Sequence, residues 1–194
     1  MIDTQYIADY LTSHALYKEG HGAGPGYLGS GMLYYAITYM FRARLCICLG
    51  LGGGFVPRCM RQAQRDLNLG DARTILVDNL SGVWGDSIVD DLDEFFRVQF
   101  PEIQLWRMST ETAALECATL KLRPDYIHID ADHSRVREDW QLYRSLCDVF
   151  TLHDTAIVCS VPELVNDLRQ DDEWDVVDFK EIGTGLTLVK RRMI

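Results

Sequence analysis

Five short apolar runs recur along the chain, and the segments between them are helical or irregular in pattern. Short runs rich in β-branched and aromatic side chains and bounded by turn residues are typical of buried β-strands. The runs cover residues 45–49, 74–77, 103–107, 126–129 and 149–152. Strands that alternate with crossover segments form a parallel sheet with helices on both faces. The alternation therefore predicts an α/β fold with a doubly wound sheet.

The carboxyl-terminal end of the chain breaks this alternation. Two β-rich runs, residues 175–180 and 186–190, are separated only by residues 181–185. Such a short connection cannot hold the crossover helix that parallel strands need, so the two runs are expected to pair antiparallel. The sequence thus predicts seven strands, mostly parallel, with an antiparallel carboxyl-terminal hairpin.

The length and charge of the chain limit its organisation and its partners. A chain of 194 residues fits one domain, in which residues 1–42 form a helical and loop region that helps to cover the active site and residues 43–194 form the core. Nineteen Lys and Arg against twenty-nine Asp and Glu leave a formal charge of −10. Nucleic acids and anionic membranes bind mainly through cationic side chains, so neither is an expected partner. A small neutral or cationic molecule fits better.

Targeting signals and cysteine usage indicate where the protein works. No basic segment followed by an apolar run begins the chain, and no segment approaches the length of a membrane span. The six cysteines include no CxxC pair, which is typical of buried free thiols in a reducing compartment. We therefore expect a soluble, cytoplasmic protein.

The region before the first strand combines two helical patterns with a glycine-rich loop. Apolar residues at helical spacing predict a helix over residues 4–17, and an aromatic-rich helix is expected over residues 32–42. Between them lies HGAGPGYLGSG, residues 21–31, the most flexible sequence of the chain. It is either an ordinary connector or a lid over an active site.

The first predicted strand leads directly into a glycine-dense turn. The sequence LCICLGLGGGFVP, residues 45–57, places Gly50 and Gly52 to Gly54 between this strand and a weakly helical segment, residues 58–67. Glycine adopts positive φ readily and lets a ligand approach the main-chain N–H groups. Such a turn at the carboxyl edge of a parallel sheet is either a cofactor loop or a tight connection. Asp78, at the end of the second strand, could hold both ribose hydroxyls of a bound nucleoside or could cap a helix.

A denser polar cluster follows the fourth and fifth strands. In YIHIDADH, residues 126–133, side chains alternate, so His128 and Asp130 share one side of the strand. His153 and Asp154 end the fifth strand in FTLHDT. If these strands are neighbours, about 4.8 Å apart, both polar ends converge on one ion or one substrate.

The residue types in this cluster suggest acid–base and metal chemistry. His128 is predicted to be a packed, hydrogen-bonded residue, whereas either His133 or His153 could act as a general base. The carboxylates of Asp130 and Asp154 suit Mg²⁺ or Mn²⁺, and an imidazole from His153 would favour a transition metal. No HExxH or paired CxxC motif indicates zinc.

Together, LCICLGLGGG, ILVDN, YIHIDADHS, LHDTA and DVVDF…GTGLTLVKR resemble the class I S-adenosylmethionine-dependent methyltransferases. Within them, the chain resembles most the small-molecule O-methyltransferases that include cephalosporin-hydroxylase-like, macrocin-type and rhamnosyl methyltransferases. The resemblance extends from about residue 32 to the carboxyl terminus. It implies a Rossmann-like fold, S-adenosylmethionine as cofactor and a hydroxylated small molecule or sugar as methyl acceptor.

The resemblance also implies a role for individual positions. Gly50 and Gly52 would approach the methionine part of the cofactor, Asp78 would hold the ribose, and Met108 and Ser109 would lie beside the adenine. Asp130 matches a family acid that binds Mg²⁺ in metal-using members and approaches the cofactor. His153 and Asp154 match an acidic pair that completes the metal site, and His133 matches a histidine near the acceptor hydroxyl.

Three positions depart from the family pattern, and they keep other functions open. Cys48 replaces the first-strand acid that usually holds the methionine amino group, His153 replaces a carboxylate, and Cys147–Asp148 replace a Gly-Gly turn. A non-catalytic protein that binds the cofactor or a partner is therefore one alternative. An NAD-type oxidoreductase, based only on the glycine turn and Asp78, is another. Assembly into a homo-oligomer that completes the site through the amino-terminal region also remains open.

Overall fold

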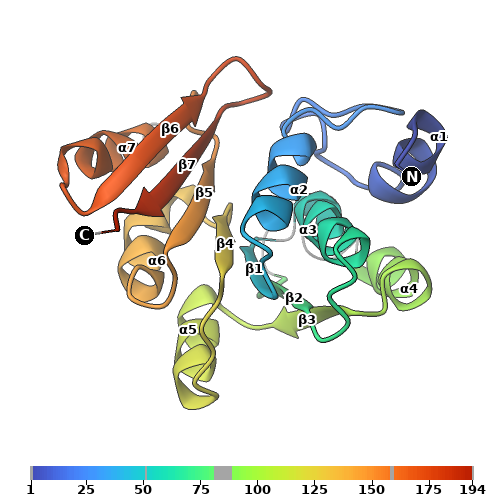
Figure 1. Ribbon diagram of the computed structural model, residues 1–194, viewed down its shortest axis with the longest axis horizontal. Helices are drawn as coiled ribbons and strands as arrows, with labels where there is room; N and C mark the ends of the chain where they lie inside the picture. Colours follow the sequence, from blue (N-terminus) through green and yellow to red (C-terminus); the bar gives the residue numbers. More distant parts are fainter. Residues whose placement is uncertain (1, 51, 81–88, 158–159, 194) are drawn as a thin grey trace.

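The computed structural model describes residues 2–50, 52–80, 89–157 and 160–193, and its centre is a seven-stranded sheet in the order β3-β2-β1-β4-β5-β7-β6 (Figure 1). The parallel strands are β1 (Leu45–Leu49), β2 (Arg73–Asp78), β3 (Ile103–Arg107), β4 (Tyr126–Ile129) and β5 (Val149–His153). The final pair, β6 (Trp174–Phe179) and β7 (Leu186–Arg191), is antiparallel, and β7 also pairs antiparallel with β5. The predicted fold class, strand number and closing hairpin are confirmed.

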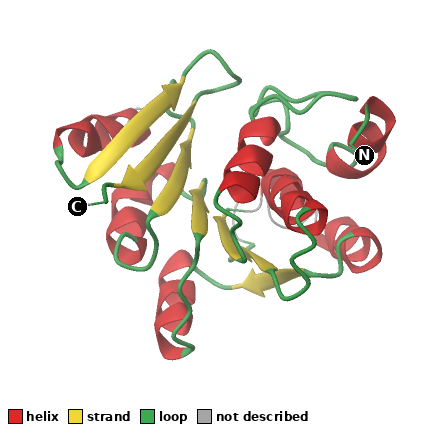
Figure 2. Ribbon diagram, viewed as in Figure 1, coloured by secondary structure: helices red, strands yellow, loops and turns green. Residues whose placement is uncertain are grey.

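Helices cover both faces of the sheet, as a doubly wound fold requires (Figure 2). One face carries α2 (Gly31–Met40), α3 (Phe55–Asp66) and α4 (Val89–Gln99). The opposite face carries α5 (Thr110–Thr119), α6 (Val136–Tyr143) and α7 (Ser160–Gln170). No described helix is both long and apolar enough to cross a membrane.

The alternation of side chains along β1 and β4 divides the interior into two cores. Cys46, Cys48 and Tyr126 belong to the core beneath α2 and α3, whereas Ile47 and Ile127 belong to the core beneath α5, α6 and α7. All five described cysteines are buried free thiols, and Cys159 lies outside the described residues. Because both faces of these strands are buried, their sequences are continuously apolar rather than alternating.

The amino-terminal helix is shorter than predicted. It consists of α1 (Thr4–Tyr6) and the π-helical turn η1 (Ile7–Leu11), so the helix predicted over residues 4–17 is wrong in its second half. His14 and Tyr17 have φ angles of 51° and 66°. A right-handed helix cannot continue through residues in this left-handed region.

Helix α3 is almost wholly buried although its sequence is polar. Its side chains from Phe55 to Gln64 are all covered, including Arg58. The Arg58 guanidinium donates a hydrogen bond to the Ser13 carbonyl and lies 4.0 Å from the centre of the Phe95 ring. Arg58 therefore ties the amino-terminal segment to the helix that follows the glycine turn.

The end of β1 packs directly against the end of β4. Asp130 N donates to Leu49 O at 2.9 Å, and on the other side of β1 Gly50 N donates to Val77 O of β2 at 2.9 Å. Gly50 has a φ of +99°, and a Cβ atom there would lie 2.0 Å from Asp130 O. Only glycine allows the two strand ends to approach so closely.

We expect Gly50→Ala to reduce the free energy of unfolding by at least about 1–3 kcal/mol, because the backbone conformation alone strains a non-glycine residue by this amount. Gly70→Ala is the matched control, since a Cβ atom at Gly70 meets nothing within 4 Å. Urea unfolding of both variants measures the difference. Equal unfolding midpoints for Gly50→Ala and Gly70→Ala would contradict the close contact.

Candidate functional site

A cavity of about 880 Å³ opens where the parallel strands end. Its lining includes every residue that the sequence singled out as a candidate for cofactor, metal or catalysis. These are Gly50, Gly52, Asp78, Met108, Ser109, Asp130, His133, His153 and Asp154. The wall opposite the strand ends is formed by the amino-terminal segment, which contributes Tyr17, Glu19, Gly20 and His21. The fold thus gathers strand ends and an amino-terminal loop around one space.

Asp78 and Ser109 both border the cavity and make local hydrogen bonds as well. Asp78 Oδ1 accepts a hydrogen bond from the Leu80 N–H at 2.6 Å. Ser109 caps helix α5, and its hydroxyl accepts from Thr112 N at 3.2 Å. The turn interaction of Asp78 fixes its carboxylate at the end of β2, beside the cavity.

Asp130 lies at the centre of an unusual cluster of imidazoles. Four of the five histidines of the chain have a ring nitrogen within 3.9 Å of its carboxylate. The distances from Oδ2 are 3.2 Å to His153 Nδ1, 3.7 Å to His128 Nε2 and 3.9 Å to His21 Nε2, and Oδ1 lies 3.3 Å from His133 Nε2. The two carboxylate oxygens therefore face two different groups.

Asp154 joins the cluster from the cavity side. Its Oδ2 atom lies 3.0 Å from His133 Nε2, and its Oδ1 atom lies 3.4 Å from His153 Nδ1. Among the described residues, two sets of side chains bring three ligand atoms within 4.8 Å of one another: Asp130, His133 and Asp154, and His21, Asp130 and His153. The trio predicted from the sequence, Asp130, His153 and Asp154, spans both sets.

The electrostatic environment gives these imidazoles different pKa values. Contact with Asp130, and then with Asp154, raises the pKa of His133 to about 10. Burial, and then the neighbouring His153, lowers the pKa of His21 to about 3, so this ring is neutral at ordinary pH. Burial would raise the pKa of Asp130, but the charge of His153 and the contacts of His128 and His133 hold it well below its usual value. Asp130 is therefore an anion among imidazoles of different charge.

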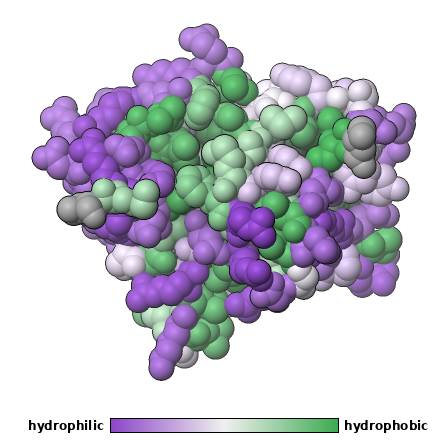
Figure 3. Space-filling view, viewed as in Figure 1, coloured by the Kyte–Doolittle hydropathy of each residue, from purple (hydrophilic) through white to green (hydrophobic). Residues whose placement is uncertain are grey.

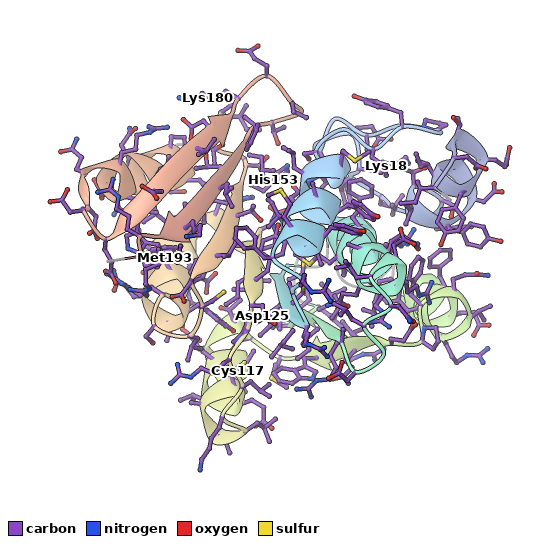
Figure 4. The ribbon with its side chains drawn as sticks, viewed as in Figure 1. Lys18, Cys117, Asp125, His153, Lys180 and Met193 are labelled. Atoms are coloured by element: carbon purple, nitrogen blue, oxygen red, sulfur yellow. The ribbon has the colours of Figure 1, made fainter. Side chains whose placement is uncertain are left out.

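The two candidate bases differ in access to the cavity. His133 begins the short helix η3 (His133–Arg135), and its side chain is 30% exposed. His153 is buried, and its Nε2 atom lies 3.3 Å from Gly20 O and 3.1 Å from Thr184 Oγ1 (Figure 4). A substrate in the cavity reaches His133 more easily than His153.

His128 is packed and hydrogen-bonded, in agreement with its prediction. It is fully buried, and its Nδ1 atom lies 2.8 Å from Thr151 Oγ1, which also contacts Tyr126 Oη at 2.7 Å. Its other nitrogen faces Asp130, so the ring also belongs to the imidazole cluster.

His21 is the residue that sequence reasoning missed. It lies in the loop 21–31, where glycines dominate, and only 2% of it is exposed. Its ring stacks on His153 with a centroid separation of 4.0 Å. No spacing pattern connects His21 with the strand ends, and the available signal was only that a histidine begins a glycine-rich loop.

We expect Thr151→Val to lower the free energy of unfolding by about 1–3 kcal/mol, since it leaves the buried Tyr126 hydroxyl and His128 Nδ1 without their shared partner. Thr119→Val removes a comparable hydroxyl at the exposed end of α5, where the bond goes to Leu115 O. Denaturant unfolding should show a small change for Thr119→Val. An equally small change for Thr151→Val would show that the hydroxyl does not support the cluster.

No protein-family model matches the sequence, and no curated protein matches it. Solved structures do match. An O-methyltransferase from Bacillus cereus in complex with S-adenosylhomocysteine has 11% identity and a TM-score of 0.68, over 89% of this chain and 83% of that one. The O-methyltransferase TomG from Streptomyces achromogenes, in complex with S-adenosylmethionine and involved in tomaymycin synthesis, has 16% identity and a TM-score of 0.66, over 95% and 90%. A methyltransferase from Podospora anserina bound to S-adenosylhomocysteine has 12% identity and a TM-score of 0.67, over 88% and 80%. At these identities the likeness concerns the fold, and the chain has the Rossmann-like fold of these methyltransferase structures.

Proposed function

We propose that the protein is an S-adenosylmethionine-dependent methyltransferase that methylates a hydroxyl group of a small molecule. One observation carries the proposal: a single cavity joins the glycine turn and Asp78 to the carboxylate–imidazole cluster. Its volume of about 880 Å³ lies within the range of small-molecule sites, roughly 300–1,000 Å³. The fold shared with methyltransferase structures supports the same reading.

The cofactor fits the cavity by the chemistry of its lining. Gly50, Gly52, Asp78, Met108 and Ser109 all line the cavity. We assign the glycine main chain to the methionine part, the Asp78 carboxylate to the ribose, and Met108 and Ser109 to the adenine. A Cβ atom at Gly52 would lie 3.9 Å from Asp130 Oδ2, so this carboxylate is close to the turn. Asp130 is therefore the acid that we assign to the methionine amino group.

Cys48 does not supply that acid. Its side chain is buried, and its Sγ atom lies 3.6 Å from Gly50 O. Burial raises the pKa of the thiol well above its ordinary value, so it stays neutral. Asp130, on the neighbouring strand β4, supplies a negative charge at the same end of the sheet.

Methyl transfer needs an acceptor oxygen in line with the sulfonium and a place for its proton. The S–CH₃ bond breaks as the O–CH₃ bond forms, and sulfur keeps the electron pair. The enzyme contributes mainly orientation and proton transfer. We place the acceptor hydroxyl beside His133 and Asp154, the exposed side of the cluster. Asp154 would take the proton, while His133, protonated at neutral pH because of its raised pKa, would stabilise the acceptor oxygen.

A divalent cation such as Mg²⁺ or Mn²⁺ would be held by the carboxylates of the cavity-facing set Asp130, His133 and Asp154, with His153 adjoining it. His133 would have to lose its proton to become the third ligand. Two carboxylates in reach of one point are the ligands that such hard cations prefer. When bound, the cation would act as a Lewis acid that lowers the pKa of a chelated hydroxyl. Metal assistance is thus part of the proposal.

The expected partners follow from the same site. A small hydroxylated acceptor is the proposed substrate, and nucleic acid and membrane remain excluded as expected partners because of the net charge of −10. The homo-oligomer remains a prediction. Met32 and Met40 of α2 are exposed. Figure 3 shows hydrophobic surface in the middle of the view, where Figure 1 places α2.

A non-catalytic cofactor-binding protein is the second candidate. It is favoured by the buried Cys48 and by His153 at a position where the resemblance implies a carboxylate. An NAD-type oxidoreductase would use only the glycine turn and Asp78. Two assays distinguish these candidate functions: the binding of S-adenosylhomocysteine and NADH, and the transfer of a methyl group.

We expect Asp78→Asn to weaken the binding of S-adenosylhomocysteine about 10- to 100-fold, because charged hydrogen bonds to the ribose contribute about 1.5–3 kcal/mol. Asp172→Asn makes the same change of charge in the turn before β6, away from the cavity, and should leave the affinity unchanged. Calorimetry measures both. Failure of the wild-type protein to bind S-adenosylhomocysteine would reject the proposed function.

We expect Asp154→Asn to reduce kcat about 100-fold or more, as is usual when a residue that moves a proton is removed. The affinity for S-adenosylhomocysteine should change little, since Asp154 is assigned to the acceptor. The assay transfers a labelled methyl group from S-adenosylmethionine to a panel of catechols, sugars and phenols. Tight cofactor binding without any labelled product would favour the non-catalytic candidate.

A further inference from the structure

The two carboxylate oxygens of Asp130 have different neighbours. Oδ1 faces His133 and the cavity, whereas Oδ2 faces His21, His128 and His153. These three imidazoles are buried. The ligand atoms of His21, Asp130 and His153 lie within 4.8 Å of one another.

Each imidazole around Oδ2 is held by its outer nitrogen. His153 Nε2 lies 3.3 Å from Gly20 O, and His21 Nδ1 lies 2.9 Å from Tyr34 Oη. His128 Nδ1 is held in the same way by Thr151 Oγ1. A carbonyl oxygen only accepts hydrogen bonds, so His153 carries a proton on Nε2 and, when neutral, turns the lone pair of Nδ1 toward Asp130. Histidines that bind metals are usually oriented in this way, by a hydrogen bond from the nitrogen that does not bind the metal.

Two of the three inner nitrogens have no hydrogen bond of their own. Among the described residues, His153 Nδ1 and His128 Nε2 are buried without a hydrogen-bond partner. Their distances of 3.2 and 3.7 Å from Asp130 Oδ2 therefore do not correspond to well-directed hydrogen bonds. Buried polar atoms without partners cost free energy, and a cation between the nitrogens and the carboxylate would satisfy them.

We propose that His21, Asp130 and His153 bind a first-row transition-metal ion such as Zn²⁺ or Co²⁺. Two imidazoles and one carboxylate suit these metals, whereas Mg²⁺ prefers oxygen ligands. His128, whose free nitrogen faces the same oxygen, lies beside the site. The site shares Asp130 with the Mg²⁺ or Mn²⁺ site of the proposed function but lies at the other carboxylate oxygen, and it does not depend on methyl transfer.

The bound ion would connect the amino-terminal loop with the carboxyl ends of β4 and β5. His21 belongs to the loop 21–31, Asp130 follows β4 and His153 ends β5. The loop already contacts the turn between β6 and β7, where Thr184 N donates to Gly20 O at 2.8 Å. In Figure 4 the labelled His153 lies between β5 and α2, the helix that follows this loop. The ion would thus hold the amino-terminal loop, which lines the cavity, against the ends of β4 and β5.

The test titrates metal-free full-length protein with Co²⁺, without cofactor or acceptor, and records the visible absorption of the bound ion. His21→Asn and His153→Gln keep a side-chain amide near the outer hydrogen bond and remove the inner nitrogen. Each should weaken Co²⁺ binding by at least about 10- to 100-fold, the loss known even for residues that merely orient a metal ligand. His14→Asn is the matched control, because His14 lies outside the cluster and asparagine tolerates its φ of 51°.

Two further measurements separate this site from the cavity-facing one. Asp154→Asn should weaken Co²⁺ binding by less than the loss of about 10- to 100-fold expected for His21→Asn, since Asp154 lies beside His153 but is not one of the three ligands. An excess of Mg²⁺ should not displace Co²⁺. Wild-type protein without a Co²⁺ spectrum, displacement by Mg²⁺, or equal affinity in wild type, His21→Asn and His153→Gln would overturn the proposal.

A third measurement follows the loop itself. Lys18, next to the loop, is a trypsin site, and its side chain is 19% exposed. Zn²⁺ should slow cleavage after Lys18 and raise the melting temperature in the wild type and in His14→Asn, but not in His21→Asn. Cleavage at the same rate with and without Zn²⁺ would contradict the fastening of the loop. All these readouts remain valid if the protein transfers no methyl group.

Discussion

The close approach of β1 and β4 at their carboxyl ends is the constraint on which the site depends. Gly50 leaves β1 with positive φ, and its missing side chain lets the backbone of Asp130 lie where a Cβ atom would be. This contact places the Asp130 carboxylate beside the glycine turn. The glycine turn and the polar cluster therefore meet at one residue.

Asp130 also explains why so many polar groups are tolerated in the interior. An isolated buried carboxylate is very unfavourable, but here imidazoles approach both oxygens. On the cavity side, Asp154 and His133 add a carboxylate and a half-exposed ring that can meet a substrate. On the inner side, His21 and His153 stack in a closed environment. One carboxylate therefore connects a region open to the cavity with a buried one whose imidazoles suit a transition-metal ion.

The fold was largely predictable because its strands are buried on both faces. Such strands appear in the sequence as continuous apolar runs, and the predicted bounds of β1, β3 and β4 agree with the structure. The amino-terminal helix was less predictable. Its apolar periodicity continues beyond Leu11, but the left-handed conformations of His14 and Tyr17 end it, and these depend on the packing of the segment against α3 through Ser13 and Arg58. The burial of the polar helix α3 was not visible in its composition either.

The sequence by itself determined the succession of strands along the chain, the glycine turn and the polar residues at the strand ends, since each of these is a local pattern with a physical meaning. It also predicted that Asp130 and Asp154 meet if the fourth and fifth strands are neighbours, and the structure shows that β4 and β5 pair. Only the tertiary structure decided which imidazole faces which carboxylate oxygen and that His21 joins them. These contacts join segments far apart in the chain, and no local periodicity encodes how a glycine-rich loop folds over the end of a sheet.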